Sequence, residues 1–459
     1  MRFFICSAGR PGEDYDDENF QRCETNCGHF MHEATKQKGV FNEVSQGDIA
    51  FLKYKDKLVA YGEVKSKKTG EQYLDEWNYA IYVNKWVFHN ENDHKLGVEK
   101  YGVQEATKEG SQLAVIKEIE EGFAFKKMKE INDSSDLSNK VSEYMAEKRI
   151  KEKGVFLEKV KNIVLTGAPG TGKTFLARKL AVEIVGEEKK QTTVGFVQFH
   201  QSYDYTDFVE GLRPTKPDKN GNVGFEMKNG VFKEFCEKAL NDQNGKYVFI
   251  IDEINRGEPS KIFGELFYSI DPGYRVKKED LEAGFTSIRT QYANAWAKPN
   301  AFDLALGHKD DGQYGHFFVP ANVYIIGTMN DIDRSVESID FAFRRRFTWI
   351  DVKAEDENST KMLEKLGSDL ENQARKRMKC LNNAIWNDEE KKGVDGLSSS
   401  YHIGAAYFLK LKELNGDFDK LWEYHIEPLL REYLRGVDDA SSKLEKMKDA
   451  YNLKGVDGE

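Results

Sequence analysis

The chain has 459 residues, a formal net charge of −10, and 32% charged against 39% hydrophobic residues. A chain of this length exceeds one ordinary hydrophobic core, so we expect two or three domains with a well-solvated surface. The negative charge excludes a general nucleic-acid-binding polycation, and the short apolar runs exclude a bilayer-spanning helix of roughly 20 residues, which predicts a cytoplasmic protein.

Residues 1–120 have the sequence pattern of a β-rich domain. Short stretches rich in β-branched and aromatic residues are separated by turns, and they lie at 3–6, 47–54, 57–64 and 77–83. A small barrel or a curled sheet is the natural closure for such a segment. The lysine-rich stretch 53–68 is either a local nucleic-acid-binding patch or a solvated hairpin.

Aromatic residues are frequent in the same region, and most of them must form its core. Two or three could instead line a pocket that stacks a base extruded from a duplex. The stretches 47–54 and 59–64 resemble the EVE, YTH and PUA-like group of small barrels. This resemblance implies recognition of a modified DNA base by an aromatic cage, for which the candidates are Trp77, Tyr79 and Trp86. The alternative for each of the three is packing in the core.

Four metal-competent side chains lie close together in this region: Cys23, Cys27, His29 and His32. Their spacing is compressed relative to zinc modules, whose paired ligands are separated by a longer loop. We therefore interpret them as incidental Cys and His residues near a helix start rather than as a metal site.

Residues 121–155 are predicted to be a helical linker. From Gly110 onward the composition shifts to Lys, Glu, Asp and Ser, with helical spacing at 112–119 and 137–150. The polar run 132–136 is well suited to cap the second of these helices.

A phosphate-binding loop follows an apolar strand at 163–165 and precedes a helix at 175–185. It fits the pattern G-x-x-x-x-G-K-[ST], and with the adjoining Phe175 it comprises Gly167, Ala168, Pro169, Gly170, Thr171, Gly172, Lys173 and Thr174. The glycines let backbone N–H groups surround a β-phosphate, Lys173 supplies charge to the β- and γ-phosphates, and Thr174 can ligate Mg²⁺. The loop predicts binding of a nucleoside triphosphate with Mg²⁺.

Two further apolar strands end in polar residues suited to hydrolysis. The strand 247–251 ends in Asp252 and Glu253, and the strand 323–328 leads to Asn330. In a doubly wound sheet the ligand lies at the strand C-termini, so these groups should meet the phosphates. We expect Asp252 to hold Mg²⁺ through water, Glu253 to orient or deprotonate the attacking water, and Asn330 to bind the γ-phosphate or that water.

Three consecutive arginines, 344–346, are flanked by apolar residues and precede a strand at 348–352. Guanidinium groups aimed at the γ-phosphate of a neighbouring subunit would stabilise charge in the transition state. Strands bearing a P-loop, Asp-Glu and Asn, followed by Arg, resemble the AAA+ ring NTPases, and residues 160–435 resemble the McrB family of GTP-hydrolysing restriction motors. The most specific pieces are 199–208, 251–256, 329–335 and 344–347.

The McrB resemblance implies an α/β fold, with an AAA+ doubly wound P-loop NTPase core at 156–352 and a helical lid at 353–459. The family signature usually reads Met-Asn-Thr-Ala-Asp-Arg, and Asp331 and Ile332 replace its middle pair here. In the lid, His402 stands where we expect an arginine.

Carried over by the same resemblance, Asn330 and Asp333 would position the attacking water, with Arg334 completing that motif. Arg345 or Arg346 would act across the subunit boundary of a ring, which is a hexamer by the same resemblance. The implied cofactors are GTP, with ATP as the other option, and Mg²⁺.

We interpret the chain as a ring-forming GTPase that recognises DNA carrying a modified base and drives a separate McrC-like nuclease subunit. The alternative is an ATP-driven remodeller of protein partners whose N-terminal domain is an adaptor. No N-K-x-D guanine-reading element follows the Asp-Glu strand, so the choice of GTP rests on the resemblance. Pro217-Asp218 with 226–228 imitates a PD…ExK nuclease, but 220–224 predicts a hairpin tip, which favours a chance match.

Overall fold

The computed structural model describes residues 1–454 apart from 9–16, 32–37, 55–56, 74–76, 89–115, 120, 133–134, 218, 220, 283–286 and 333–340. The chain divides into two compact units, Met1–Met145 and Ala146–Glu459, and each has a hydrophobic core of its own. Among the helices of the described residues, none is long and apolar enough to cross a membrane.

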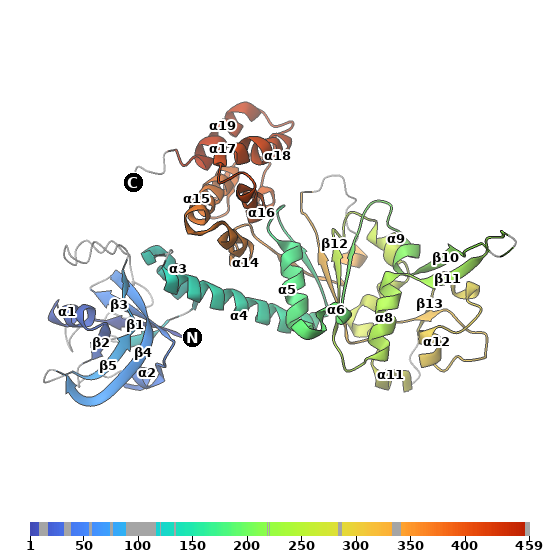
Figure 1. The fold of residues 1–459 in the computed structure, drawn as a ribbon, viewed down its shortest axis with the longest axis horizontal. Coiled ribbons are helices and arrows are strands. Elements are labelled where there is room, and N and C mark those ends of the chain that lie inside the picture. The colour runs from blue at the N-terminus through green and yellow to red at the C-terminus, as the bar shows by residue number, and fades with distance from the viewer. Residues whose placement is uncertain are drawn as a thin grey trace. The chain divides into compact units, whose positions relative to one another are not determined.

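The first unit is built on a seven-stranded sheet in the order β2-β5-β4-β3-β1-β7, with β6 paired to β4. Its strands are β1 (Phe3–Ser7), β2 (Gly28–Met31), β3 (Ile49–Tyr54), β4 (Lys57–Tyr73), β5 (Trp77–Val83), β6 (Val87–Phe88) and β7 (Ile116–Glu118). Figure 1 shows β4 as a long curved strand, which pairs with β3 along its first half and with β5 along its second half. The predicted β-rich N-terminal region is confirmed.

Alternation along β1 explains why both faces of this sheet are covered. Phe4 and Cys6 join the core beneath α1 (Asp17–Thr25) and α2 (Lys38–Glu43), whereas Phe3 and Ile5 join a second core with residues of α3 and α4. Successive strand residues point to opposite faces, so a strand with apolar residues at every position is buried on both sides.

The prediction of a helix at 112–119 is wrong for 116–119, the part of this stretch that the structure describes. Ile116–Glu118 form β7, which pairs antiparallel with β1, and the Ile119 N–H donates to the Phe3 carbonyl at 2.9 Å. The open edge of β1 supplies backbone partners, and this long-range pairing outweighs the local helical spacing. Helices α3 (Glu121–Asn132) and α4 (Asp136–Val160) follow, and the Ser135 hydroxyl accepts from the Ser138 N–H at 3.0 Å, which confirms the predicted cap.

The second unit contains a five-stranded parallel sheet in the order β16-β8-β15-β12-β9. These strands are β8 (Asn162–Thr166), β9 (Val194–Gln198), β12 (Tyr247–Asp252), β15 (Val323–Thr328) and β16 (Thr348–Asp351). The helices of this core are α5 (Lys173–Val185), α6 (Lys190–Thr193), α7 (Tyr205–Phe208), α8 (Val231–Asn241), α9 (Pro259–Phe263), α10 (Leu266–Ile270) and α13 (Phe341–Arg344). The predicted doubly wound P-loop fold is confirmed.

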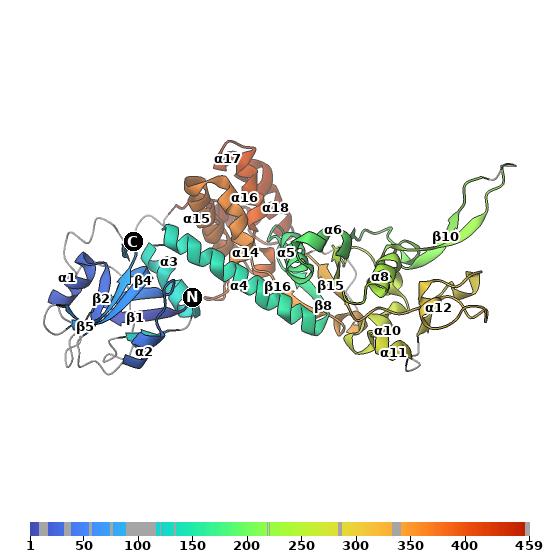
Figure 2. The same ribbon diagram turned by 60° about the horizontal axis from the view of Figure 1, so that its bottom comes forward.

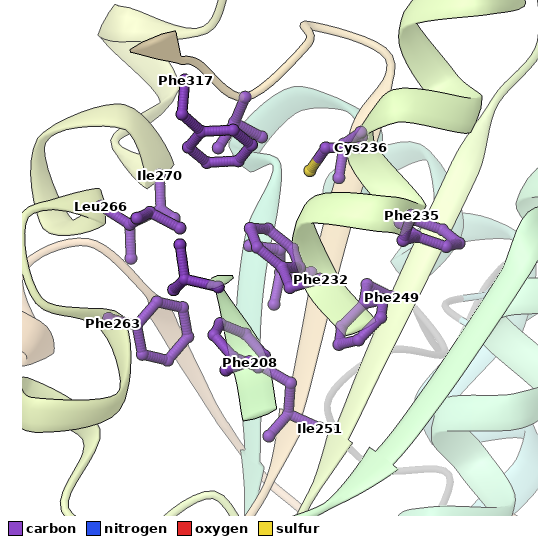
Figure 3. Close-up of a cluster of buried hydrophobic side chains, with 14 of the residues drawn as sticks. Phe208, Phe232, Phe235, Cys236, Phe249, Ile251, Phe263, Leu266, Ile270 and Phe317 are labelled. Atoms are coloured by element: carbon purple, nitrogen blue, oxygen red, sulfur yellow. The ribbon is translucent and has the colours of Figure 1, made fainter. Parts of the chain in front are cut away.

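An aromatic core fixes one face of this sheet to its helices. Figure 3 shows Phe208, Phe232, Phe249 and Phe263 packed together, and the rings of Phe208 and Phe232 stack with their centroids 4.9 Å apart. Because the strands leave this packed layer with their C-terminal ends at one edge, polar residues that follow them meet at that edge.

Two insertions extend the core. A hairpin of β10 (Glu210–Pro214) and β11 (Phe225–Asn229) projects away from the sheet (Figure 2), as the predicted hairpin tip required. The second insertion holds α11 (Lys278–Glu282), β13 (Ile288–Arg289), α12 (Ala301–Ala305) and β14 (His316–Phe317). In the nuclease-like motif, Glu226 and Lys228 lie on the hairpin and pair with each other at 2.9 Å, and Asp218 lies outside the described residues.

The C-terminal part of the second unit is a helical lid, as predicted. It contains α14 (Glu357–Thr360), α15 (Ser368–Ile385), α16 (Ala405–Phe408), α17 (Phe418–Leu421), α18 (Glu427–Tyr433), α19 (Ala440–Tyr451) and a small hairpin of β17 (Trp386–Asn387) and β18 (Lys392–Gly393). Its own apolar core includes Leu381, Ile385, Phe408, Trp422 and Tyr451.

Candidate nucleotide-binding site

The P-loop connects β8 to α5 and surrounds the Lys173 ammonium group. Lys173 is the first residue of α5, and its Nζ donates to the carbonyl oxygens of Gly167 at 3.0 Å and Ala168 at 2.8 Å. Gly170 and Gly172 have φ angles of 76° and 83°, in the left-handed region that glycine adopts most easily. The loop thus has the backbone shape that its glycine spacing predicted, with a cation inside the curve.

A hydroxyl and a carboxylate meet beside the loop. The Thr174 Oγ1 donates to Asp252 Oδ1 at 2.7 Å, and the Thr328 Oγ1 donates to the same oxygen at 2.6 Å. Hydroxyl and carboxylate oxygens are the hard ligands that Mg²⁺ prefers, so the residues present fit this ion. Our sequence reasoning missed Thr328, although its place at the end of β15, two residues before Asn330, was a usable signal.

The Glu253 carboxylate is held by two side chains from its own subunit. Asn330 Nδ2 donates to Glu253 Oε1 at 3.0 Å and to Oε2 at 3.3 Å, and Arg256 Nε donates to Oε2 at 3.2 Å. Glu253 has a φ angle of 52°, a conformation that costs about 1–2 kcal/mol for a residue with a side chain. This strained turn directly after β12 places Glu253 and Asn330, from neighbouring strands, in direct contact.

The predicted arginines separate into two environments. Arg345 is exposed, whereas Arg346 is half-buried and its guanidinium donates to the carbonyls of Ala342 and Phe267 in the same chain. Of this pair, Arg345 has the more exposed side chain. Asp333 and Arg334 lie outside the described residues.

The lid contacts the P-loop through backbone hydrogen bonds. The Gly404 N–H donates to the Pro169 carbonyl at 3.1 Å, and the Ala406 N–H donates to the Gly170 carbonyl at 3.0 Å. A Cβ atom on Gly404 would lie 2.1 Å from the Gly170 carbonyl carbon, so this approach requires glycine. Tyr407 also packs on Gly170, and burial raises the pKa of its hydroxyl. The lid therefore lies directly on the phosphate-binding loop.

His402, which stands where we expected an arginine, is buried in the lid. Its Nε2 donates to the Trp386 carbonyl at 2.8 Å. A ring nitrogen that points at a carbonyl must carry a proton, so Nε2 of His402 is the protonated nitrogen in this contact.

The three aromatic candidates of the first unit do not form one surface feature. Trp86 is 3% exposed, and its indole N–H donates to the Cys23 carbonyl at 2.9 Å, so it packs in the core and we remove it from the base-reading set. Tyr79 is half-buried, contacts the edge of Phe41, and lies 5.3 Å from the Lys38 ammonium. The side chain of Trp77 lies outside what the structure describes.

Three of the four metal-competent Cys and His residues lie in the described part of the first unit. Cys23 lies in α1, Cys27 follows this helix, His29 lies in β2, and His32 lies outside the described residues. Within the described part of the chain, no group of three or more His, Cys, Asp or Glu side chains could hold a metal ion.

Family models match the second unit. An AAA domain of the dynein-related subfamily matches residues 162–347, and the McrB alpha-helical lid domain matches residues 373–441. A further model, the IstB-like ATP binding protein, matches residues 112–208, which include the P-loop. Both the core and the lid of the second unit are therefore covered by a family model.

Curated relatives come from restriction systems. The Type IV methyl-directed restriction enzyme EcoKMcrB subunit of Escherichia coli is 38% identical over 278 residues, which cover 60% of this chain and 54% of that protein. The Type II restriction enzyme BsuMI component YdiS of Bacillus subtilis is 25% identical over 209 residues, 41% of this chain and 56% of that protein. The chain spans about half the length of both relatives.

Solved structures resemble the chain only weakly. NtrX from Brucella abortus in complex with ADP aligns at 13% identity with a TM-score of 0.27, covering 62% of this chain and 48% of that chain. A similarity at this level carries no argument here, so the site rests on the residues described above and on the family matches.

Proposed function

We propose that this chain, which is similar to McrB in its AAA domain and in its lid, is the GTP-hydrolysing motor of a system that restricts modified DNA. The observation that carries the proposal is the convergence of Lys173, the Thr174–Asp252 hydrogen bond and the Glu253–Asn330 contact at one end of the parallel sheet. These groups come from three different strand ends, and each has the chemistry that triphosphate cleavage needs.

The P-loop would hold the triphosphate. The backbone N–H groups of the P-loop, apart from Pro169, which has none, would bind the phosphate oxygens, and the Lys173 ammonium would exchange its carbonyl partners for the β- and γ-phosphates. Thr174 directly and Asp252 through water would hold Mg²⁺, which supplies positive charge to the phosphate oxygens when bound.

Hydrolysis would depend on Glu253. Its carboxylate accepts the proton of the attacking water or orients that water, and Asn330 fixes the position of the carboxylate or contacts the γ-phosphate. In the geometry described here, Arg256 and Asn330 both bind Glu253, so the carboxylate must release at least part of this bonding to engage water. Asp333 and Arg334 would complete the site as positioning residues.

A homo-oligomeric ring, a hexamer by the family resemblance, would complete the active site. Arg345 is exposed next to α13 and would donate to the γ-phosphate held by the neighbouring subunit. Because this guanidinium would reach the γ-phosphate only in the assembled ring, the rate of hydrolysis would depend on ring formation.

The first unit would recognise DNA that carries a modified base, in the manner of EVE-like domains. Tyr79 and Tyr82 are half-buried, and the ammonium groups of Lys38 and Lys68 lie 5.3 Å and 5.8 Å from their ring centres. Aromatic rings beside lysines suit a stacked base and its phosphates. Cleavage of the DNA is assigned to a separate McrC-like nuclease subunit.

A turnover panel with the full-length chain tests this function. GTP and ATP hydrolysis would be measured with Mg²⁺, alone and with duplexes that carry methylated cytosine, hydroxymethylcytosine, methylated adenine or no modification. We expect GTP hydrolysis by assembled rings and selective binding of one modified duplex. Turnover of ATP alone, with equal binding of all duplexes, would instead support the alternative of a protein remodeller with an adaptor domain.

A further inference from the structure

A cavity of about 340 Å³ lies between the P-loop and the lid. Gly167 and Ala168 line it from the P-loop, Asp351 and Lys353 from the end of β16, and Asp388 from the turn between β17 and β18. Its volume lies at the lower end of the range of about 300–1,000 Å³ that is typical of small-molecule sites. A nucleotide whose phosphates occupy the P-loop therefore has this cavity as an immediate neighbour.

An ion pair joins the segment that follows β16 to the turn between β17 and β18 in the lid. The Lys353 Nζ lies 3.5 Å from Asp388 Oδ2, and the two side chains are 58% and 35% exposed. Their polar ends are thus accessible to a ligand as well as to each other. Trp386, half-buried in the same lining, offers a flat apolar surface for a purine ring.

The two purines place different groups against such a pair. The Watson–Crick edge of guanine carries two adjacent donors, N1–H and the N2 amino group, beside the O6 acceptor. A carboxylate accepts from both donors and an ammonium donates to O6. Adenine presents the N1 acceptor to the carboxylate and the N6 amino group to the ammonium. An acceptor then faces an acceptor and a donor faces a donor, so neither hydrogen bond can form.

We infer that Lys353 and Asp388 are the guanine-reading residues of this protein. Asp388 accepts from N1 and N2 of the base, and Lys353 donates to O6. The assignment rests on the proposed function, because it needs the phosphates of the same nucleotide in the P-loop. It supplies the guanine selectivity for which the sequence has no N-K-x-D element after the Asp-Glu strand.

The other charges of the cavity favour the same base. Asp331, Asp351, Glu355 and Glu389 also line it, against one further cation, Lys379, so most of its charged side chains are carboxylates. An acceptor-rich site favours the purine edge with more donors and disfavours an edge that exposes an acceptor. The edge with two adjacent donors is that of guanine.

Binding of diphosphates to the full-length chain tests the inference without the complication of hydrolysis. Dissociation constants for GDP, ADP and xanthosine diphosphate would be measured with Mg²⁺ for the wild type and for Asp388→Asn. We expect the wild type to bind GDP about tenfold to a hundredfold more tightly than ADP, the discrimination typical of one bidentate base contact. In Asp388→Asn this preference should pass to xanthosine diphosphate, because the amide donates to the O2 carbonyl that replaces the guanine amino group.

Two further variants make the result specific. Lys353→Met should weaken GDP binding about tenfold, the loss expected for one charge-assisted hydrogen bond, and leave ADP binding unchanged or tighter. Asp395→Asn is a charge-matched control, since Asp395 is exposed in the same lid segment but does not line the cavity.

The outcomes separate the inference from the proposed function. If Asp388→Asn keeps the wild-type ratio of GDP to ADP affinity, or if the wild type binds both equally, the assignment of Lys353 and Asp388 is wrong while the NTPase function stands. If the wild type binds no diphosphate or triphosphate of either purine, the proposed function fails and the inference fails with it.

Discussion

The nucleotide site of the second unit and the aromatic surface of the first unit differ in how well their residues come together. At the nucleotide site, Lys173, Asp252 and Asn330 follow three strands that are far apart in the sequence. Thr174, next to Lys173, donates to Asp252, and Asn330 donates to Glu253, next to Asp252. In the first unit, Trp86 lies in the core and Tyr79 lies at a half-exposed edge.

The difference has a physical cause. Parallel strands bring their C-terminal ends to one edge, so a polar residue directly after a buried strand has its position set by the backbone. An aromatic residue is equally favourable in a core and at a binding surface, because both sites reward its large apolar area. The sequence therefore locates a site made of polar residues at strand ends. It does not locate a site made of aromatic residues, because their burial has to be known first.

The largest effect is expected at the P-loop lysine. Lys173→Ala removes the ammonium inside the loop and should abolish measurable nucleotide binding and turnover, because the phosphates lose their main counter-charge. Titration with a fluorescent nucleotide measures this. Lys190→Ala, which removes an exposed lysine paired with Glu187, should bind as the wild type does. If Lys173→Ala kept the nucleotide affinity of the wild type, the P-loop would not be the nucleotide-binding site.

The next effect separates binding from chemistry. Glu253→Gln keeps the shape of the side chain but cannot accept a proton, so turnover should fall by up to about ten-thousandfold while nucleotide affinity stays near that of the wild type. Phosphate release and equilibrium binding measure the two parts. Glu258→Gln changes an exposed carboxylate that pairs with Lys261 and serves as the control. A parallel loss of affinity would argue against a role confined to water activation.

The two neighbouring arginines should give different phenotypes. Arg345→Ala should lower turnover of assembled rings about a thousandfold and leave stability unchanged, because in the proposed ring its exposed guanidinium would act on the neighbouring subunit. Arg346→Ala should lower the free energy of unfolding by about 1–3 kcal/mol, since it removes charge-assisted bonds to two carbonyls. Turnover as fast in isolated monomers as in rings would show that no arginine acts between subunits.

In the first unit, a core role and a surface role can be distinguished by paired substitutions. Trp86→Ala should lower the free energy of unfolding by about 3–5 kcal/mol, because it leaves a cavity and the Cys23 carbonyl without its donor. Thermal or denaturant unfolding measures this loss. Stability equal to the wild type would mean that Trp86 is not the core residue that its burial indicates.

The smallest effect is expected at Tyr79. Tyr79→Ala should weaken binding of the preferred modified duplex about tenfold, the share of one stacked base, and should cost less stability than Trp86→Ala. Phe41→Leu, which alters the buried ring that Tyr79 contacts, controls for packing. Unchanged discrimination between modified and unmodified duplexes in Tyr79→Ala would exclude this residue as a base reader.

The sequence alone determined the parts of this protein whose signals are local. The glycine spacing of 167–172, the apolar runs that end in Asp252 and at Thr328, and the cap at Ser135 each specify their own backbone, because the interactions involved span only a few residues. The order of these strands then indicated a doubly wound sheet with its site at one edge.

Only the tertiary structure decided the features that depend on distant partners. Residues 116–118 became a strand because β1 offered an open edge, and Trp86 became a core residue because α1 supplied an acceptor. Lys353 and Asp388 are brought together by the folding of the segment between them, which belongs to the lid. Contacts of this kind are fixed by the packing of whole elements, and no short stretch of sequence encodes them.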